Sequence, residues 1–481
     1  MSAAWVIQAT NFLAAFLFIY GLKRMSSPVT ARSGIRVAGY GMLLAILAGF
    51  LYLYGLRPEA QSHLGANLVL TLVALLIGIG WSWRGGKKVP LTDMPQMVAL
   101  YNGMGGGAAG AIAAVELLGG HSSNATYLVV TLVGAVIGAI SFSGSLIAWA
   151  KLDGRIRKPW RMKGQHIFNA VVLLVVLALG VAVALGTTIS LGPVAISASA
   201  LIAVFFGVAL LYGIMATMPI GGADMPVVIS LYNALTGLAV GLDGFALQNP
   251  ALMIAGMVVG SAGTLLTLLM AKAMNRSVSH VLFSNFGDVS IEPEGEMEGA
   301  MKPVEASDAA IAMRYAGKVI IVPGYGLAAA QAQQKLYEFV KVLQAAGVDV
   351  KFAIHPVAGR MPGHMDVLLA EAGVPYDMIA ELDEVNDEFK GTDVALVIGA
   401  NDVVNPAART DKGSPIYGMP ILNVDQAHQV YVLKRGKGKG YAGVENALFY
   451  ADNTGMVYGD ARETLVKMIS AVKELGGEAA A

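Results

Sequence analysis

A glycine-rich stretch after an apolar run is the clearest sign of chemistry in this chain. Residues 318–331 read Lys-Val-Ile-Ile-Val-Pro-Gly-Tyr-Gly-Leu-Ala-Ala-Ala-Gln, so Gly324-x-Gly326 separates a β-branched run from helix-forming residues. Glycines let a backbone turn tightly and approach a pyrophosphate, and the N–H groups that begin a helix favour an anion. The order strand, glycine loop, helix predicts a nucleotide site, with an ordinary strand-to-helix turn as the alternative because the motif alone is weak.

Three later loops carry more polar and basic residues, and each follows another predicted strand. Because parallel strands end at one edge of a sheet, where ligands bind, we expect these loops to face the same ligand. The loops read His355-Pro-Val-Ala-Gly-Arg360, Gly399-Ala-Asn-Asp402, and Lys434-Arg435 followed by Gly440-Tyr-Ala-Gly443.

The residue types in these loops favour NADP(H) over NAD(H). An NAD-specific unit has an acid at the end of its second strand, and this chain has His355 there. Lys434 and Arg435 are suited to a 2′-phosphate, although a solvated basic loop is the alternative. Asp402 either orients a carboxamide or caps a helix.

Two histidines lie in the second of these loops. His355 and His364 lack a third ligand at suitable spacing. We therefore favour loop packing for both and predict no metal site.

Strands and helices alternate in the C-terminal third, which predicts a doubly wound parallel sheet of Rossmann-like α/β type. A last helix is expected over residues 461–475, another at 364–372, and one that follows the glycine motif and runs to residue 346. The predicted strands are 319–322, 348–354, 376–379, 394–398, 421–424 and 430–433.

The remainder of the chain is too apolar for a water-soluble protein. Of 481 residues, 56% are hydrophobic and 14% are charged, with no cysteine and a net charge of zero. This composition predicts a polytopic α-helical membrane domain and favours no nucleic-acid partner. Apolar stretches of about 20 residues, enough to span a bilayer, occur nine times, at residues 4–22, 37–56, 64–83, 94–118, 127–149, 167–187, 194–217, 225–247 and 252–274.

The expected domains are a membrane domain (1–275), a hinge and linker (276–316) and a soluble domain (317–481). Basic residues follow the first, third, fifth and ninth apolar stretches. By the positive-inside rule, the N-terminus is expected in the periplasm and the soluble domain in the cytoplasm of a bacterial inner membrane.

A duplicated motif begins the fourth and eighth apolar stretches. Asp93-Met-Pro-Gln-Met-Val-Ala-Leu-Tyr-Asn102 matches Asp224-Met-Pro-Val-Val-Ile-Ser-Leu-Tyr-Asn233. Each Asn lies nine residues after its Asp, about 13 Å along a helix and close to the bilayer midplane. This parallel repeat predicts a polar path, which Ser141, Ser143, Ser145, Ser261 and Thr264 could extend. The alternative is that each Asn only joins helices.

Titratable residues are scarce in the apolar stretches. No Lys, Arg or His is expected inside the membrane, and Glu116 and Asp243 are expected near the outer ends. Glu116 could form an outer mouth, although an acid at the interface is more often solvated.

The loop motifs, together with Gly222-Ala-Asp-Met-Pro226, resemble the beta subunit of proton-translocating NAD(P) transhydrogenase over nearly the whole chain. The resemblance implies a Re/Si-specific enzyme that binds NADP(H) on this chain. Hydride would come from NADH on a partner alpha subunit as protons move inward, in a dimer of alpha–beta units. The implied cofactor residues are Gly324, Tyr325, Gly326, Ala328, Val357, Ala358, Gly359, Arg360, Gly399, Ala400, Asn401, Asp402, Lys434, Arg435, Gly440, Tyr441 and Ala442.

The resemblance also implies roles for single residues. Asp402 would act at the catalytic centre, and Lys434 and Arg435 would hold the 2′-phosphate under a lid that runs through Tyr441. The proton path would include Asn102, Asp224, Asn233 and Ser261.

The chain departs from the family pattern at Asn102, where other members carry a histidine. A histidine on a partner helix could replace it. The rival interpretation is a channel or carrier regulated by a nucleotide-sensing domain. A quinone-linked oxidoreductase would need a flavin or metal site, and the sequence indicates neither.

Overall fold

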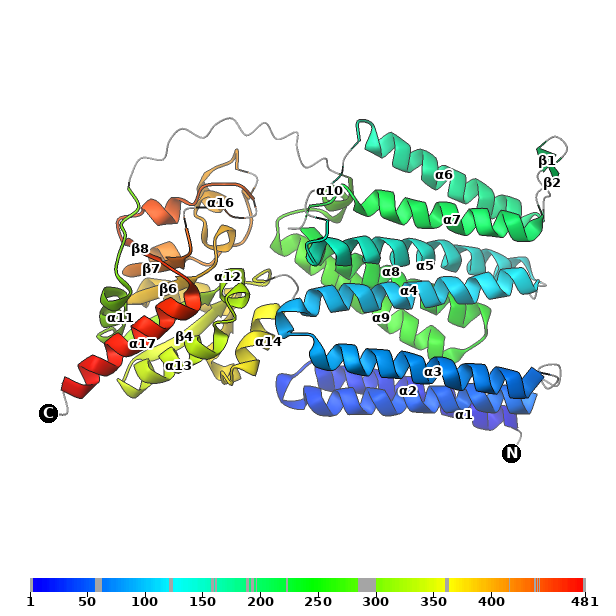
Figure 1. Ribbon diagram of the computed structural model, residues 1–481, viewed down its shortest axis with the longest axis horizontal. Coiled ribbons are helices and arrows are strands. Elements are labelled where there is room, and N and C mark those ends of the chain that lie inside the picture. The colour runs from blue at the N-terminus through cyan, green and yellow to red at the C-terminus, as the bar shows by residue number, and fades with distance from the viewer. Residues whose placement is uncertain are drawn as a thin grey trace. The chain divides into compact units, whose positions relative to one another are not determined.

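The computed structural model describes two compact units, 1–220 with 228–267 and 221–227 with 268–481 (Figure 1). The described residues are 3–56, 63–120, 124–156, 160, 162–186, 190–191, 194–195, 197–221, 224–283, 300–359, 363–414, 416–436, 438, 440 and 442–478.

Nine helices in the described residues are long and apolar enough to cross a membrane. This confirms the predicted polytopic membrane domain. They are α1 (Ala3–Met25), α2 (Pro28–Leu56), α3 (Leu64–Lys88), α4 (Met94–Gly119), α5 (Ala125–Leu152), α6 (Gln165–Ala184), α7 (Ala198–Thr217), α8 (Met225–Ala246) and α9 (Pro250–Ala273).

The expected start of the seventh apolar stretch is wrong. Its first residues form the hairpin strand β2 (Val194–Ala195), which pairs with β1 (Ser190–Leu191), and the helix begins only at Ala198. Ser197 caps that helix, because its side chain accepts a hydrogen bond from the N–H of Ala200 at 3.3 Å.

Small residues let α4 and α5 approach closely. A Cβ added to Gly138 would lie 2.8 Å from Gly106 O, so the two backbones are in contact. In α8 and α9, a Cβ on Gly237 would lie 2.7 Å from Gly260 Cα. The two glycine pairs occupy equivalent positions of the predicted repeat, so both hairpins pack through the same small residues.

Within its described residues, the second unit contains six parallel strands in the order β5-β4-β3-β6-β7-β8. β3 pairs with β4 on one side and β6 on the other, in the registers Val319↔Val350 and Val319↔Val394. This confirms the predicted Rossmann-like domain. The strands are β3 (Lys318–Pro323), β4 (Asp349–Ile354), β5 (Ile379–Glu381), β6 (Val394–Ile398), β7 (Gln429–Lys434) and β8 (Thr454–Tyr458).

Different structures cover the two faces of the sheet. The helices α11 (Ala306–Arg314), α13 (Gln333–Ala345) and α17 (Ala461–Glu478) pack together along one face (Figure 1). The other face is covered by short turns, whose Phe389, Leu422 and Leu448 bury against Ile320 and Val432. The remaining elements of this unit are α10 (Val278–Phe283), α12 (Tyr325–Ala329), α14 (His364–Glu371), α15 (Leu382–Val385), α16 (Ala407–Thr410) and the 3-10 turns Tyr376–Met378, Asn386–Gly391, Asp402–Val404, Val424–Gln426 and Ala447–Tyr450.

The strand predicted at residues 421–424 is wrong. Leu422 and Val424 are apolar because they cover a face of the sheet, and a 3-10 turn begins at Val424. The sixth strand is instead β8, which the sequence analysis missed because Gly455 interrupts its short apolar run. The strand expected at 376–379 is also displaced, since Tyr376–Met378 is a 3-10 turn that leads into β5.

Part of the predicted linker belongs to the second unit. Val304 N donates to Met456 O at 2.9 Å and Met456 N donates to Lys302 O at 2.8 Å, so residues 302–304 extend the sheet beside β8. The helix α11 follows directly and packs on α17. Residues 284–299 lie outside the described part of the chain.

Candidate nucleotide site and membrane polar layer

The glycine motif lies at the point where the strand order reverses, between β3 and β6. Gly324 N donates to Ile398 O at 2.8 Å and Gly326 N to Gly399 O at 3.0 Å. A Cβ on Gly324 would lie 2.6 Å from Ala400 N, and one on Gly326 would lie 2.6 Å from Gly399 Cα. The loops after β3 and β6 therefore cross backbone to backbone, which only glycine permits. Such reversal points hold the ligands of open α/β sheets.

The helix expected to run from this motif to Ala346 is interrupted. The short helix α12 begins at Tyr325 and buries Ala328, and Gln331 then adopts a φ of 49° before α13 begins. The left-handed residue redirects the chain, so the glycine loop leads into one helical turn rather than a long helix.

Three side chains join the loop after β6 to the segment after β7. Asp402 Oδ2 accepts a hydrogen bond from Ala442 N at 3.0 Å, and Asn405 Nδ2 donates to Glu445 O at 2.9 Å. Asn446 Nδ2 donates to both the carbonyl O and Oδ1 of Asn401 at 3.1 Å. The predicted residues Asn401, Asp402 and Ala442 are thus brought together, whereas Asn405 and Asn446 were missed.

The basic pair at the end of β7 has one half-buried and one exposed member. Lys434 Nζ lies 4.6 Å from the centre of the Phe449 ring and donates to Gly438 O. Burial lowers the pKa of Lys434, and the negative charge of Asp402 opposes that shift. Arg435 is exposed, and Gly440 is half-buried. Arg435 is therefore accessible to an anion at this edge of the sheet.

The loop after β4 is packed around His355, which is 1% exposed. His355 Nδ1 accepts from Val357 N at 3.2 Å, so the proton lies on Nε2, which donates to Pro420 O at 2.7 Å. Burial lowers the pKa of His355 to about 4. The interpretation of His355 as a loop-packing residue is confirmed, because both ring nitrogens are occupied by protein atoms.

Other predicted members of this loop are also accounted for. Ala358 is buried, and Gly359 has a φ of 106°, in the left-handed region that favours glycine. A Cβ on Gly359 would lie 2.6 Å from Nδ1 of the buried His364. Arg360 and Tyr441 lie outside the described residues.

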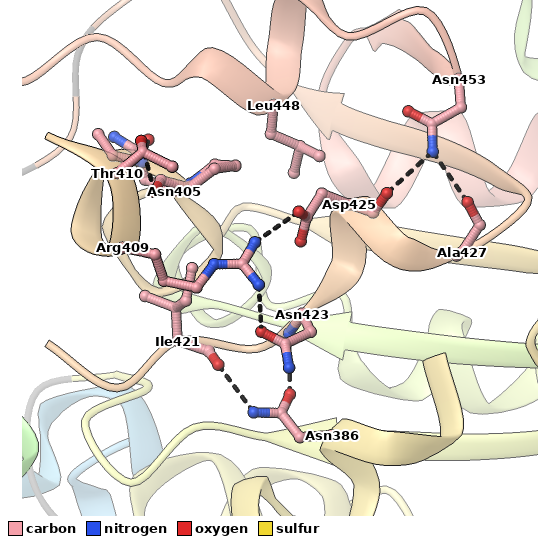
Figure 2. Close-up of polar contacts among 12 residues, drawn as sticks. Asn386, Asn405, Arg409, Thr410, Ile421, Asn423, Asp425, Ala427, Leu448 and Asn453 are labelled. Carbon is pink, nitrogen blue, oxygen red and sulfur yellow. Dashed lines mark hydrogen bonds and ion pairs between the residues drawn. The ribbon is translucent and has the colours of Figure 1, made fainter. Parts of the chain in front are cut away.

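A second polar network holds the segment between α16 and β7 (Figure 2). Arg409 pairs with Asp425 Oδ2 at 2.5 Å and donates to Asn423 Oδ1 at 2.8 Å. Asn423 N donates to Asn386 Oδ1 at 2.8 Å, and Asn453 Nδ2 donates to Ala427 O at 2.8 Å. The sequence analysis missed these residues.

In the membrane unit, buried polar groups from three helices meet. Asn102 Nδ2 on α4 donates to Ser145 Oγ on α5 at 3.0 Å, and Thr236 Oγ1 on α8 donates to Asn102 O at 3.5 Å. Ser141 Oγ lies 2.5 Å from Thr236 Oγ1. We call Asn102, Ser141, Ser145 and Thr236 the polar layer. Thr236 was missed by the sequence analysis.

The other predicted proton-path residues lie elsewhere. Ser261 is exposed and its Oγ donates to Met257 O at 2.7 Å within its own helix, while Asn233 is half-buried. Asp224 is 1% exposed and its Oδ1 lies 3.4 Å from Arg276 Nη1. The hydrogen bond of Ser261 therefore stays within its own helix, and the ion pair of Asp224 is with Arg276.

The fold and these contacts define a membrane protein that carries a Rossmann-like α/β domain with a glycine crossing at its ligand-binding edge. A family model described as NAD(P) transhydrogenase beta subunit matches residues 7–471. The chain therefore belongs to the NAD(P) transhydrogenase beta subunit family. It is similar to the NAD(P) transhydrogenase subunit beta of Rhodospirillum rubrum, with 46% identity over 476 residues that cover 96% of this chain and 98% of the relative. The subunit beta from a named strain of the same organism gives the same values.

Proposed function

We propose that this chain is the NADP(H)-binding and proton-conducting subunit of a proton-translocating transhydrogenase. The nicotinamide of the bound NADP⁺ accepts hydride from NADH, which is held on a partner alpha subunit. Family membership supports this reaction class. The main support for the nucleotide site is the close backbone contact of Gly324 and Gly326 with Gly399, where the strand order reverses between β3 and β6.

The residues at the sheet edge fit a nucleotide with a 2′-phosphate. The end of β4 continues into buried, neutral His355 rather than an acid, so no carboxylate there repels a phosphate. Lys434 and Arg435 follow β7 and supply two cations. Arg435, which is exposed, provides the fork of N–H donors that best matches a phosphate.

In this proposal the segment from Lys434 to Asn446 closes over the nucleotide. Asp402, Asn401 and Asn405 hold it to the loop that contains Gly399. These contacts tie the proposed phosphate-binding residues to the glycine crossing. Asp402 then acts by positioning the segment, and its contact with the reacting groups remains a prediction.

Proton movement supplies the driving force. One proton crossing about 150 mV carries roughly 3.5 kcal/mol, which biases the nucleotide equilibrium by about 300-fold. Coupling requires two conformations in which nucleotide binding and the proton path influence each other. The polar layer offers the groups for such a path, because its hydroxyls and amide are buried and hydrogen-bonded across three helices.

We also propose the domain and membrane arrangement. The membrane domain spans about residues 1–275, and the nucleotide domain starts near Lys302, earlier than the expected residue 317. The basic loops support a nucleotide domain in the cytoplasm and an N-terminus in the periplasm of a bacterial inner membrane. An alpha subunit completes each unit, and two alpha–beta units form a dimer.

The test uses the full chain co-purified with its alpha subunit and reconstituted into liposomes. NADPH formation and an internal pH dye are recorded after addition of NADH and NADP⁺. We expect NADPH formation with proton uptake from the liposome interior, so that the internal pH rises, only when both subunits are present. We also expect Re/Si-specific transfer of deuterium from labelled NADH. Ion movement that responds to nucleotide without any hydride transfer would instead favour the channel or carrier with a sensing domain.

A further inference from the structure

Asp243 is an unusual residue of the membrane unit. The nine described membrane helices contain two acids, Glu116 in α4 and Asp243 in α8. Glu116 is half-buried, but Asp243 is 2% exposed. Among the described residues, Asp243 Oδ2 has no hydrogen-bond partner. A buried carboxyl group with an unused oxygen is therefore present in the helix bundle.

The surroundings of Asp243 are small and uncharged. A Cβ added to Gly134 of α5 would lie 3.1 Å from Asp243 Oδ1, so this glycine makes room for the carboxyl group. The charged residues of α5 and α9, which pack against this part of α8, are Lys151 and Lys272, near the opposite ends of those helices. Lys151 is 17 residues from Gly134, about 25 Å along the helix. No described cation on these helices can neutralise Asp243.

Tyr127, near the start of α5, lies at the nearby end of the bundle. The Tyr127 ring is centred 5.6 Å from that of Phe245, and Gln248 Nε2 donates to Tyr127 Oη at 2.7 Å. Gln248 follows Asp243 by five residues, just beyond the end of α8, and Tyr127 lies near the start of α5. They mark the end of the bundle that the positive-inside rule places outside.

Asp243 lies on the same helix face as the polar layer. Thr236 and Asp243 are seven residues apart, which is two helical turns and about 10 Å. On α5, Ser141 and Gly134 have the same spacing and lie opposite Thr236 and Asp243. The α5–α8 interface therefore carries a carboxyl group and, two turns deeper, the hydroxyls of the polar layer.

We propose that Asp243 takes up and releases protons between the outer end of α8 and the polar layer. An ionised carboxylate without a partner is costly in hydrocarbon, and an acid that accepts a proton avoids this cost. Passage over the remaining 10 Å or so requires intervening water, because that distance exceeds a hydrogen bond. The inference deepens the proposed function and rests on its proton movement.

The test compares Asp243→Asn with Asp243→Glu in the reconstituted two-subunit complex. Asp153→Asn is the matched control, because Asp153 lies beyond the end of α5 in an exposed ion pair with Arg155. Proton uptake coupled to NADPH formation should fall by about 100-fold in Asp243→Asn, the lower end of what a positioned proton donor contributes. It should be largely retained in Asp243→Glu, and NADP⁺ affinity should stay unchanged in both.

Isotope-edited infrared spectra of the wild-type complex in lipid provide a second readout that needs no turnover. A protonated-carboxyl band that is lost in Asp243→Asn and kept in Asp153→Asn supports the proposal, even if the Asn variant is unstable. Normal proton uptake by Asp243→Asn, or absence of the band at every pH tested, overturns it. Failure of the wild-type complex to move protons would instead refute the proposed function itself.

Discussion

The carboxylate of Asp402 accepts a hydrogen bond from the backbone N–H of Ala442 at 3.0 Å, across 40 residues of sequence. Asp402 follows β6, and Ala442 belongs to the segment that follows β7. Together with the side-chain hydrogen bonds of Asn405 and Asn446, this contact joins the ends of the two strands.

Asp402→Ala should weaken NADP⁺ binding to the two-subunit complex about tenfold. Loss of one hydrogen bond to a charged group costs about 1.5 kcal/mol, which is about tenfold in affinity. Calorimetric titration measures the change. Asp377→Ala is the control, because Asp377 is exposed in a 3-10 turn. Equal affinities for the two variants would rule out a role of Asp402 in positioning the segment.

Arg435→Ala should reduce the preference for NADP⁺ over NAD⁺. Loss of a charge-assisted hydrogen bond to the 2′-phosphate costs about 1.5–3 kcal/mol, or about 10–100-fold in NADP⁺ affinity. NAD⁺ affinity should stay the same, because NAD⁺ lacks that phosphate. The control is Lys390→Ala, which removes an exposed cation from a 3-10 turn. An equal loss of affinity for both nucleotides would contradict the assignment.

Gly399→Ala should destabilise the nucleotide domain by about 2–4 kcal/mol through backbone strain and overlap. Gly399 has a φ of 64°, and a Cβ there would lie 2.7 Å from Gly326 N. Gly443→Ala isolates the strain, because Gly443 has a φ of 73° but open space around its Cα. Its expected cost is about 1 kcal/mol. Hydrogen exchange of the β3 and β6 amides measures the loss of stability in each variant. Similar losses for Gly399→Ala and Gly443→Ala would refute the close crossing.

His355 should make the nucleotide domain less stable in mild acid. Its pKa is lowered from 6.5 to about 4 by burial, so below pH 6.5 the unfolded chain binds a proton that the folded chain does not. Stability is then constant above pH 6.5 and falls by about 3 kcal/mol as the pH drops to about 4. Comparing unfolding free energies of wild type and His355→Gln across this range isolates the contribution. The exposed His428 provides the control His428→Gln, and an unchanged pH dependence in His355→Gln would contradict the assignment.

Thr236→Val should slow proton-coupled NADPH formation without changing NADP⁺ affinity. The substitution keeps the shape of the side chain and removes the hydroxyl that contacts Ser141 Oγ and Asn102 O. Thr264→Val is matched chemically, because Thr264 is exposed and donates only to Gly260 O in its own helix. Similar rates of proton uptake for the two variants would exclude Thr236 from the path.

The sequence by itself determined the membrane helices, most strands of the sheet and the edge at which we propose that a ligand binds. Runs of about 20 apolar residues specify membrane helices, because a helix of that length spans the hydrocarbon core and makes its backbone hydrogen bonds within itself. Alternating strands and helices specify a parallel sheet, and Gly324-x-Gly326 after a β-branched run indicates a loop at its edge. These patterns involve residues that are close in the sequence, so they can be recognised without the tertiary structure.

Tertiary structure decided which distant groups meet. Ser141 and Thr236 are 95 residues apart, and their contact depends on which face of α8 packs on α5. The same packing buries Asp243, for which the sequence indicated only a position near the outer end of its helix. Leu422 and Val424 have the residue types of a strand, but they cover a face of the sheet, and β8 forms its edge strand instead. An apolar pattern fixes that a side chain is buried, and only the packed fold fixes what it is buried against.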